Sequence, residues 1–103
     1  MKFFLVTVGS KTYPEIDPLT FAQKYENDID EGQLKKGIES AFKKAFRKAG
    51  IEVKSLQPLN VADYVHMENT TLSTVGMILD SKIEKVKRLR RKAFWDSIFG
   101  FFA

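Results

Sequence analysis

The hydrophobic positions of this chain form short apolar runs in some segments and helically spaced stripes in others. Residues 3–8 are a run of aromatic and β-branched side chains that ends at Gly9, which predicts a buried strand. Residues 51–56 begin with a clean apolar–polar alternation and predict a half-exposed strand, interrupted by Pro58. A secretory signal peptide is the alternative for the first run. Its single Lys, short apolar stretch and missing small-residue cleavage site favour the strand.

The clearest helical pattern covers residues 31–49. Its apolar side chains fall within an arc of about 140° at 3.6 residues per turn. They are Leu34, Ile38, Ala41, Phe42, Ala45, Phe46 and Ala49. Lysine and arginine occupy the opposite side, and Gly50 ends the pattern. The segment is therefore expected to be an amphipathic helix whose outer face is basic, either as an ordinary solvated face or as a binding face.

Residues 10–31 are irregular and acidic. The pair Asp17-Pro18 is a helix-start signal, after which Leu19, Ala22 and Tyr25 would line one face of a short helix. A group of acids follows, without the fixed spacing and the glycine of a calcium loop. These acids are Glu26, Asp28, Asp30 and Glu31. We expect them to form a solvated loop or to lie near the start of the next helix.

The second half of the chain ends in a long helical pattern. Residues 61–67 are expected to continue the preceding strand or to form a short one, and residues 71–79 predict another strand with a bulge at Gly76. A last helix is expected from Asp80 or Ser81. Its apolar face consists of Ile83, Val86, Leu89, Ala93 and Phe94. The periodicity fails after Ala93, and residues 94–103 form an aromatic C-terminal tail.

Together these elements predict a small α+β fold, a mainly antiparallel sheet with helices packed on one face. The 103 residues suffice for a single domain, residues 1–103, and the order of the strands stays open. The absence of cysteine excludes disulfides, thiolate metal sites and cysteine nucleophiles, and a single histidine argues against structural zinc. We expect no cofactor and no metal. No apolar run approaches the ~20 residues of a membrane span, so a cytoplasmic location is the default expectation.

The charge is distributed unevenly along the chain. Residues 1–31 and 55–80 each carry a net charge of −3, whereas residues 32–54 and 81–103 each carry +5. Two basic helices on one chain favour binding of a polyanion, most plausibly nucleic acid, with affinity that falls as salt rises. The candidate binding residues are Lys36, Lys43, Lys44, Arg47, Lys85, Arg88, Arg91 and Lys92. Whether these two sets share a surface depends on the fold.

The aromatic tail supports a second hypothesis. Aromatic side chains beside arginine are frequent anchors of protein interfaces, and the simplest partner is a second copy of the chain. The candidate partner-binding residues are Phe94, Trp95, Phe99 and Phe102. A basic helix ending in Trp and Phe is also typical of helices that lie at a membrane surface without crossing it. The remaining alternative is that the tail completes the protein's own core.

Catalytic motifs are weak. His66 lies near Asp63, Tyr64, Thr71 and Ser73 in sequence, but a catalytic triad is defined by geometry, and we expect a protein that is not an enzyme. Residues 9–12, Gly-Ser-Lys-Thr, lack the earlier glycine of a phosphate loop and predict a strand-ending turn. The triplet at residues 69–71 matches an N-glycosylation pattern, which arises often by chance.

Overall fold

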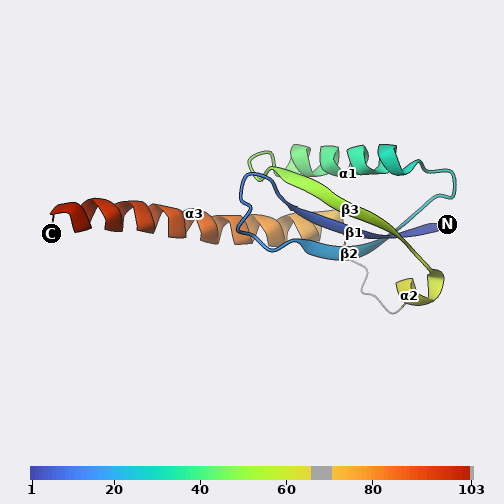
Figure 1. Ribbon diagram of the computed structural model, residues 1–103. Helices are drawn as coiled ribbons and strands as arrows, with labels where there is room; N and C mark the ends of the chain where they lie inside the picture. Colours follow the sequence, from blue (N-terminus) through green and yellow to red (C-terminus); the bar gives the residue numbers. More distant parts are fainter. Residues whose placement is uncertain (66–70, 103) are drawn as a thin grey trace.

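The computed structural model describes residues 1–65 and 71–102, and the side chains as far as residue 100. The elements follow in the order β1 (Lys2–Ser10), β2 (Leu19–Tyr25), α1 (Glu31–Ala45), β3 (Ile51–Leu59), α2 (Val61–Val65) and α3 (Leu72–Phe102). The three strands form one sheet in the order β2-β1-β3, and both pairings are antiparallel (Figure 1). The prediction of a small α+β fold with an antiparallel sheet is confirmed.

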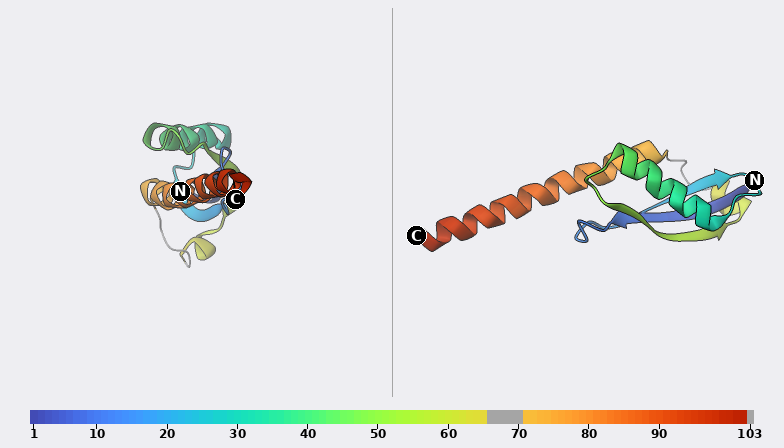
Figure 2. Two further views of the ribbon diagram at one scale, coloured as in Figure 1. Left: turned by 90° about the vertical axis from the view of Figure 1, so that its left-hand side faces the viewer. Right: turned by 90° about the horizontal axis from the view of Figure 1, so that it is seen from above.

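The central strand β1 contributes three buried side chains to the core. Phe4, Val6 and Val8 alternate to one face of the sheet and are buried. Val6 lies opposite Phe21 of β2 and Leu56 of β3, and Val8 lies opposite Val53. Helix α1 and the first half of α3 cover this face (Figures 1 and 2). The strands predicted at residues 3–8 and 51–56 are confirmed, with longer bounds, but the predicted interruption at Pro58 is wrong, because β3 continues through Pro58 to Leu59 as an edge strand.

The short helix predicted after Asp17-Pro18 is wrong, because residues 19–25 form strand β2. A period of two places Leu19, Phe21 and Tyr25 on the core side, and Phe21 is buried. Pairing along the whole edge of β1 outweighs the local capping signal. The Tyr25 hydroxyl has no hydrogen-bond partner among the described residues, and burial raises the pKa of this phenol.

Helix α1 confirms the predicted amphipathic helix but ends at Ala45 rather than residue 49. Asp30 caps its start, since a side-chain oxygen accepts a hydrogen bond from the Gln33 amide at 3.3 Å. The acids at residues 30–31 therefore serve the helix start, as expected. Leu34, Ile38 and Phe42 are the buried side chains of the helix. Beyond it the chain turns, and Gly50 takes a left-handed φ of 60° before β3 begins.

Helix α3 begins at Leu72, so the strand predicted at residues 71–79 is wrong. Thr71 caps the helix in place of Asp80 or Ser81, its hydroxyl oxygen accepting a hydrogen bond from the Thr74 amide at 3.2 Å. Three helically spaced residues join the core, namely Val75, Leu79 and Ile83. Gly76 is not a bulge, because it lies in the helix directly beneath the ring of Phe46.

Residues 61–65 form the one-turn helix α2 instead of the predicted strand. The side-chain oxygen of Asn60 accepts a hydrogen bond from the Asp63 amide at 2.7 Å, which starts the turn. Tyr64 packs on Phe3, with ring centroids 4.5 Å apart. Because Phe3 alternates to the sheet face opposite the main core, α2 closes the end of the sheet at which β1 begins (Figure 1).

Candidate functional site

Helix α3 leaves the folded body, defined as the sheet, α1 and α3 as far as Ile83, and projects from it (Figures 1 and 2). The molecule is consequently elongated, with principal extents of 62 × 26 × 18 Å. Arg90, beyond the buried stripe of α3, contacts the body. Its guanidinium pairs with the Glu15 carboxylate and lies 4.8 Å from the centre of the Tyr13 ring. Both partners of this ion pair are about half exposed, so it adds a contact between α3 and the body beyond the buried stripe.

The end of α3 exposes aromatic rings. Phe94, Trp95 and Phe99, here called the aromatic tip, are 60%, 52% and 65% exposed. The Phe94 and Trp95 rings meet edge to face at 5.7 Å, and Trp95 stacks with Phe99 at 5.9 Å. The hypothesis that these three residues complete the protein's own core is therefore wrong. Phe102 belongs to α3, but its side chain lies outside the described part.

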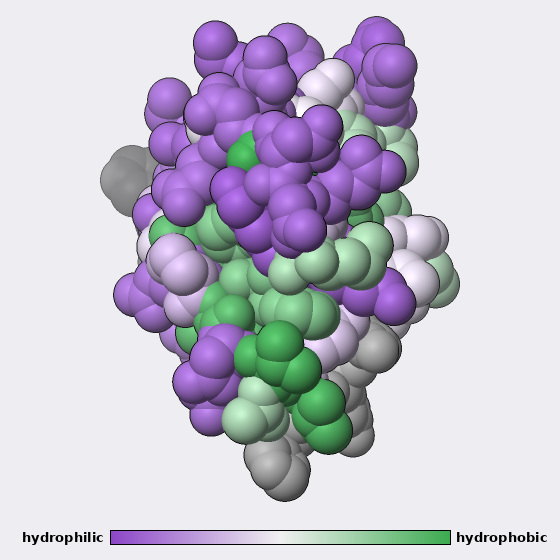
Figure 3. Space-filling view, turned by 90° about the vertical axis from the view of Figure 1, so that its right-hand side faces the viewer, coloured by the Kyte–Doolittle hydropathy of each residue, from purple (hydrophilic) through white to green (hydrophobic). Residues whose placement is uncertain are grey.

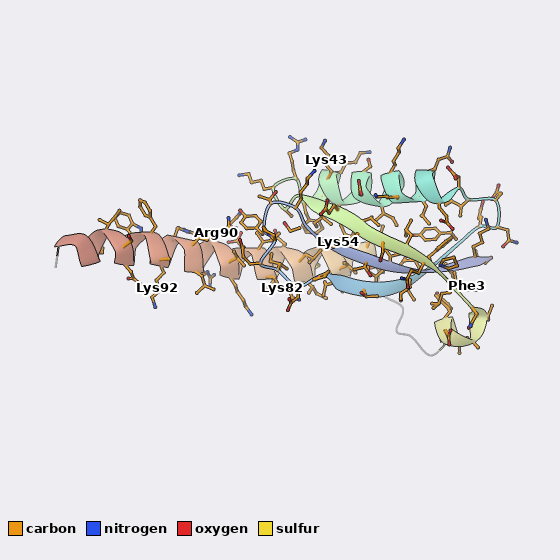
Figure 4. The ribbon with its side chains drawn as sticks, viewed as in Figure 1. Phe3, Lys43, Lys54, Lys82, Arg90 and Lys92 are labelled. Atoms are coloured by element: carbon orange, nitrogen blue, oxygen red, sulfur yellow. The ribbon has the colours of Figure 1, made fainter. Side chains whose placement is uncertain are left out.

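Four of the seven cations that precede the aromatic tip on α3 are here called the basic turns. Lys85, Arg88, Arg91 and Lys92 are exposed on the side of the helix away from its buried stripe. Figure 4 shows Lys92 extending away from α1. Within residues 1–65 and 71–100 the ion pairs use other cations, such as Lys87 with Glu84 at 3.4 Å and Arg90 with Glu15. The basic turns therefore keep their charge available for a partner.

The predicted cations of α1 form a separate group. Lys36, Lys43 and Arg47 line a shallow hollow of about 450 Å³ beside the start of β3, and Glu39 lines it as well. Lys44 is exposed but does not line this hollow. Lys85 lines a different hollow, with Met77 and Ile78 of α3. The fold thus places three of the predicted cations, all from α1 and the turn after it, around one hollow. None of the basic turns lines this hollow.

The opposite end of the molecule carries an apolar hollow that the sequence analysis missed. It measures about 460 Å³, and we call it the end hollow. Its lining residues are Met1, Lys2, Phe3, Phe4, Glu31, Pro58, Leu59, Asn60 and Val61. Figure 3 shows this end of the molecule, with hydrophilic residues in the upper part of the view and apolar residues on the surface in its centre and lower part. Three elements distant in sequence meet here, so no local pattern marks the site.

Of the catalytic and modification motifs considered from the sequence, those that lie within the described residues have structural roles. The buried Ser10 hydroxyl donates to the Ala49 carbonyl at 2.5 Å and accepts from the Tyr13 amide at 3.0 Å, which confirms the strand-ending turn. His66 and residues 69–70 lie outside the described residues, so neither the triad nor the glycosylation triplet is tested. Thr71 caps α3. The described residues contain no group of three or more acidic, His or Cys side chains placed to hold a metal.

Comparisons with models of known protein families, with curated proteins and with solved structures find no match to this chain. Among the described helices, none is both long enough and apolar enough to cross a bilayer.

Proposed function

We propose that this protein is a small non-enzymatic interaction protein whose binding element is the projecting part of α3. The observation that carries the proposal is the exposed aromatic tip at the end of a helix that has already left its own core. A helix whose apolar side chains face water gains stability when a partner covers them. Aromatic residues followed or preceded by arginine are the usual anchors of such interfaces.

Covering the tip would contribute apolar burial to association with a partner. Each ring is half exposed or more. Burying on the order of 100 Å² per ring at about 25 cal/mol per Å² gives roughly 2–3 kcal/mol for each one.

Replacement of Phe94, Trp95 and Phe99 together by alanine tests the proposal. We expect the triple variant to lose any concentration-dependent increase in mass by light scattering, and any binding to lipid vesicles, because both need the tip. Its thermal unfolding should match that of the original chain, since these side chains contact no part of the core. Alanine is a good helix former, so α3 should persist.

A matched control is the double variant Met77→Ala and Ile78→Ala, which removes exposed apolar side chains from the packed half of α3. This control should associate like the original chain. Association and vesicle binding that survive in the tip variant would overturn the proposed function.

A second candidate function is binding of nucleic acid through α1. The favouring observation is that Lys36, Lys43 and Arg47 line one hollow. A single-stranded oligonucleotide should then bind with a salt-sensitive affinity, and Lys43→Glu with Arg47→Glu should abolish that binding at low salt. Reversal of Lys85 and Arg88 would have little effect, because they lie outside this hollow. Equal losses in both variants would reject α1 as the specific site.

A further inference from the structure

We propose that the end hollow receives the aromatic tip of a second copy of this chain, so that copies join head to tail. This inference rests on the proposed function, in which the tip is the binding element. It adds the identity of the partner and the surface that the partner presents.

The two surfaces lie at opposite ends of one elongated molecule. Helix α3 carries the tip away from the sheet, whereas the end hollow lies where β1 begins and β3 ends (Figures 1 and 4). The long dimension of 62 Å and the continuous α3 helix keep a tip far from the hollow of its own chain. Contact between these two surfaces must therefore join different copies.

The end hollow has an apolar lining and is large enough for aromatic side chains. Its apolar lining residues are Met1, Phe3, Phe4, Pro58, Leu59 and Val61. Met1 and Val61 are 60% and 58% exposed, so this apolar lining is open to water in a single copy. A volume of about 460 Å³ falls in the range of pockets that enclose small organic groups, and it can accept aromatic side chains from a helix end.

Charge favours the same pairing. The acidic loop before α1 borders the end hollow, since the Lys2 ammonium at its rim donates to the Ile29 carbonyl at 3.4 Å. Exposed acids gather at this end, namely Glu26, Asp28, Asp30, Glu31 and Asp63. Arg91 and Lys92 lie within one helical turn before Phe94, and Lys85 lies about 14 Å before it at 1.5 Å per residue, so the basic turns would lie against this rim once the tip is seated. Opposite charges at such a rim speed association and fix orientation.

A tip-to-tip pair would be less favourable. It would bring two projecting basic segments together, with their basic turns facing a partner of like charge. A head-to-tail contact is heterologous, and it leaves one free tip and one free hollow on every open assembly. Repetition of this contact produces an open chain of copies unless the rotation closes a ring.

The test combines variants that each destroy one surface. The hollow variant is Val61→Arg, which places a charge in the apolar wall at an exposed position. Its matched control is Val65→Arg, in the same one-turn helix, 71% exposed and outside the hollow lining. The tip variant is the triple alanine replacement of Phe94, Trp95 and Phe99. Light scattering or sedimentation then measures the mass of each alone and of mixtures.

We expect the original chain and the Val65→Arg control to form assemblies whose mass rises with concentration. The tip variant and the hollow variant should each associate at least tenfold more weakly. An equimolar mixture of the two should form a pair of twice the mass of one chain and nothing larger, because only one intact tip and one intact hollow meet. Raised salt should weaken the assemblies, as the charge argument requires.

Four results would overturn the inference. The first is an original chain that stays monomeric at the highest concentration reached. The second is an equimolar mixture of the tip variant and the hollow variant that forms no pair. The third is a hollow variant that assembles normally while the tip variant does not. This result would reject the end hollow as the receiving surface but keep the proposed function, with the tip of a second copy or a lipid vesicle as the partner. Normal assembly of both variants would reject the inference and the proposed function together.

Discussion

Leu79→Ala should lower the free energy of unfolding by about 2–5 kcal/mol, the range for truncation of a fully buried leucine. Leu79 has no exposed surface and lies in the middle of the stripe that docks α3 onto the sheet. Truncation removes its packing contacts and leaves a cavity between α3 and the core. Small domains have total stabilities of about 5–15 kcal/mol, so the loss would be a large part of the whole. Urea unfolding followed by circular dichroism measures it.

Leu89→Ala is the matched control in the same helix. Leu89 is 66% exposed, beyond the last buried residue of α3, and its truncation should change the stability by less than about 0.5 kcal/mol. If Leu79→Ala proved as mild as Leu89→Ala, α3 would not be docked as the structure has it. The projecting tip and the basic turns would then have no fixed direction relative to the end hollow.

The dependence on Leu79 also explains how the fold serves the proposed assembly. The docked half of α3 is held by Val75, Leu79 and Ile83, and the ion pair of Arg90 with Glu15 adds a contact farther along the helix. The helix can therefore present the tip at a defined distance from the body. Head-to-tail contacts between rigid copies lose less conformational freedom on association than contacts through a flexible tail.

The parts of the fold that could be predicted from the sequence are those in which local pattern and burial agree. Residues 3–8 are apolar throughout and become the central strand, and the stripe of Leu34, Ile38 and Phe42 becomes the buried face of α1. In β2 the two kinds of signal disagree. Asp17-Pro18 resembles a helix start, but the alternation of Leu19, Phe21 and Tyr25 fits the edge of β1, and pairing there decides the outcome.

In the first half of α3 the local and the longer-range patterns also disagree. Its threonine and valine residues favour a strand, whereas the spacing of Leu72, Val75 and Leu79 continues the helical stripe of Ile83 and Val86. The longer pattern prevails because it buries one face of an uninterrupted helix. The sequence shows the basic and aromatic residues of the tail, but their exposure depends on where α3 leaves the sheet. The end hollow requires the tertiary fold, because β1, β3 and the start of α1 all contribute to it.

Gly76→Ala and Gly37→Ala should change stability in opposite directions. Both glycines lie inside helices, where alanine is favoured by roughly 0.5–1 kcal/mol. Gly37 is exposed, and an added Cβ meets no atom within 4 Å, so the replacement should stabilise the protein by about that amount. Gly76 is buried, and an added Cβ would lie 2.1 Å from a ring carbon of Phe46.

The Phe46 ring cannot remain in place beside an alanine at residue 76. It must turn outward or α3 must move away from α1, and overpacking of this kind costs about 1–3 kcal/mol before the gain in helix propensity is subtracted. We expect a net loss of about 1–2 kcal/mol for Gly76→Ala, measured by urea unfolding beside Gly37→Ala. A stabilising Gly76→Ala would mean that α3 does not approach Phe46 this closely. A Phe46→Ala background should remove most of the penalty, because it deletes the ring that the new methyl group meets.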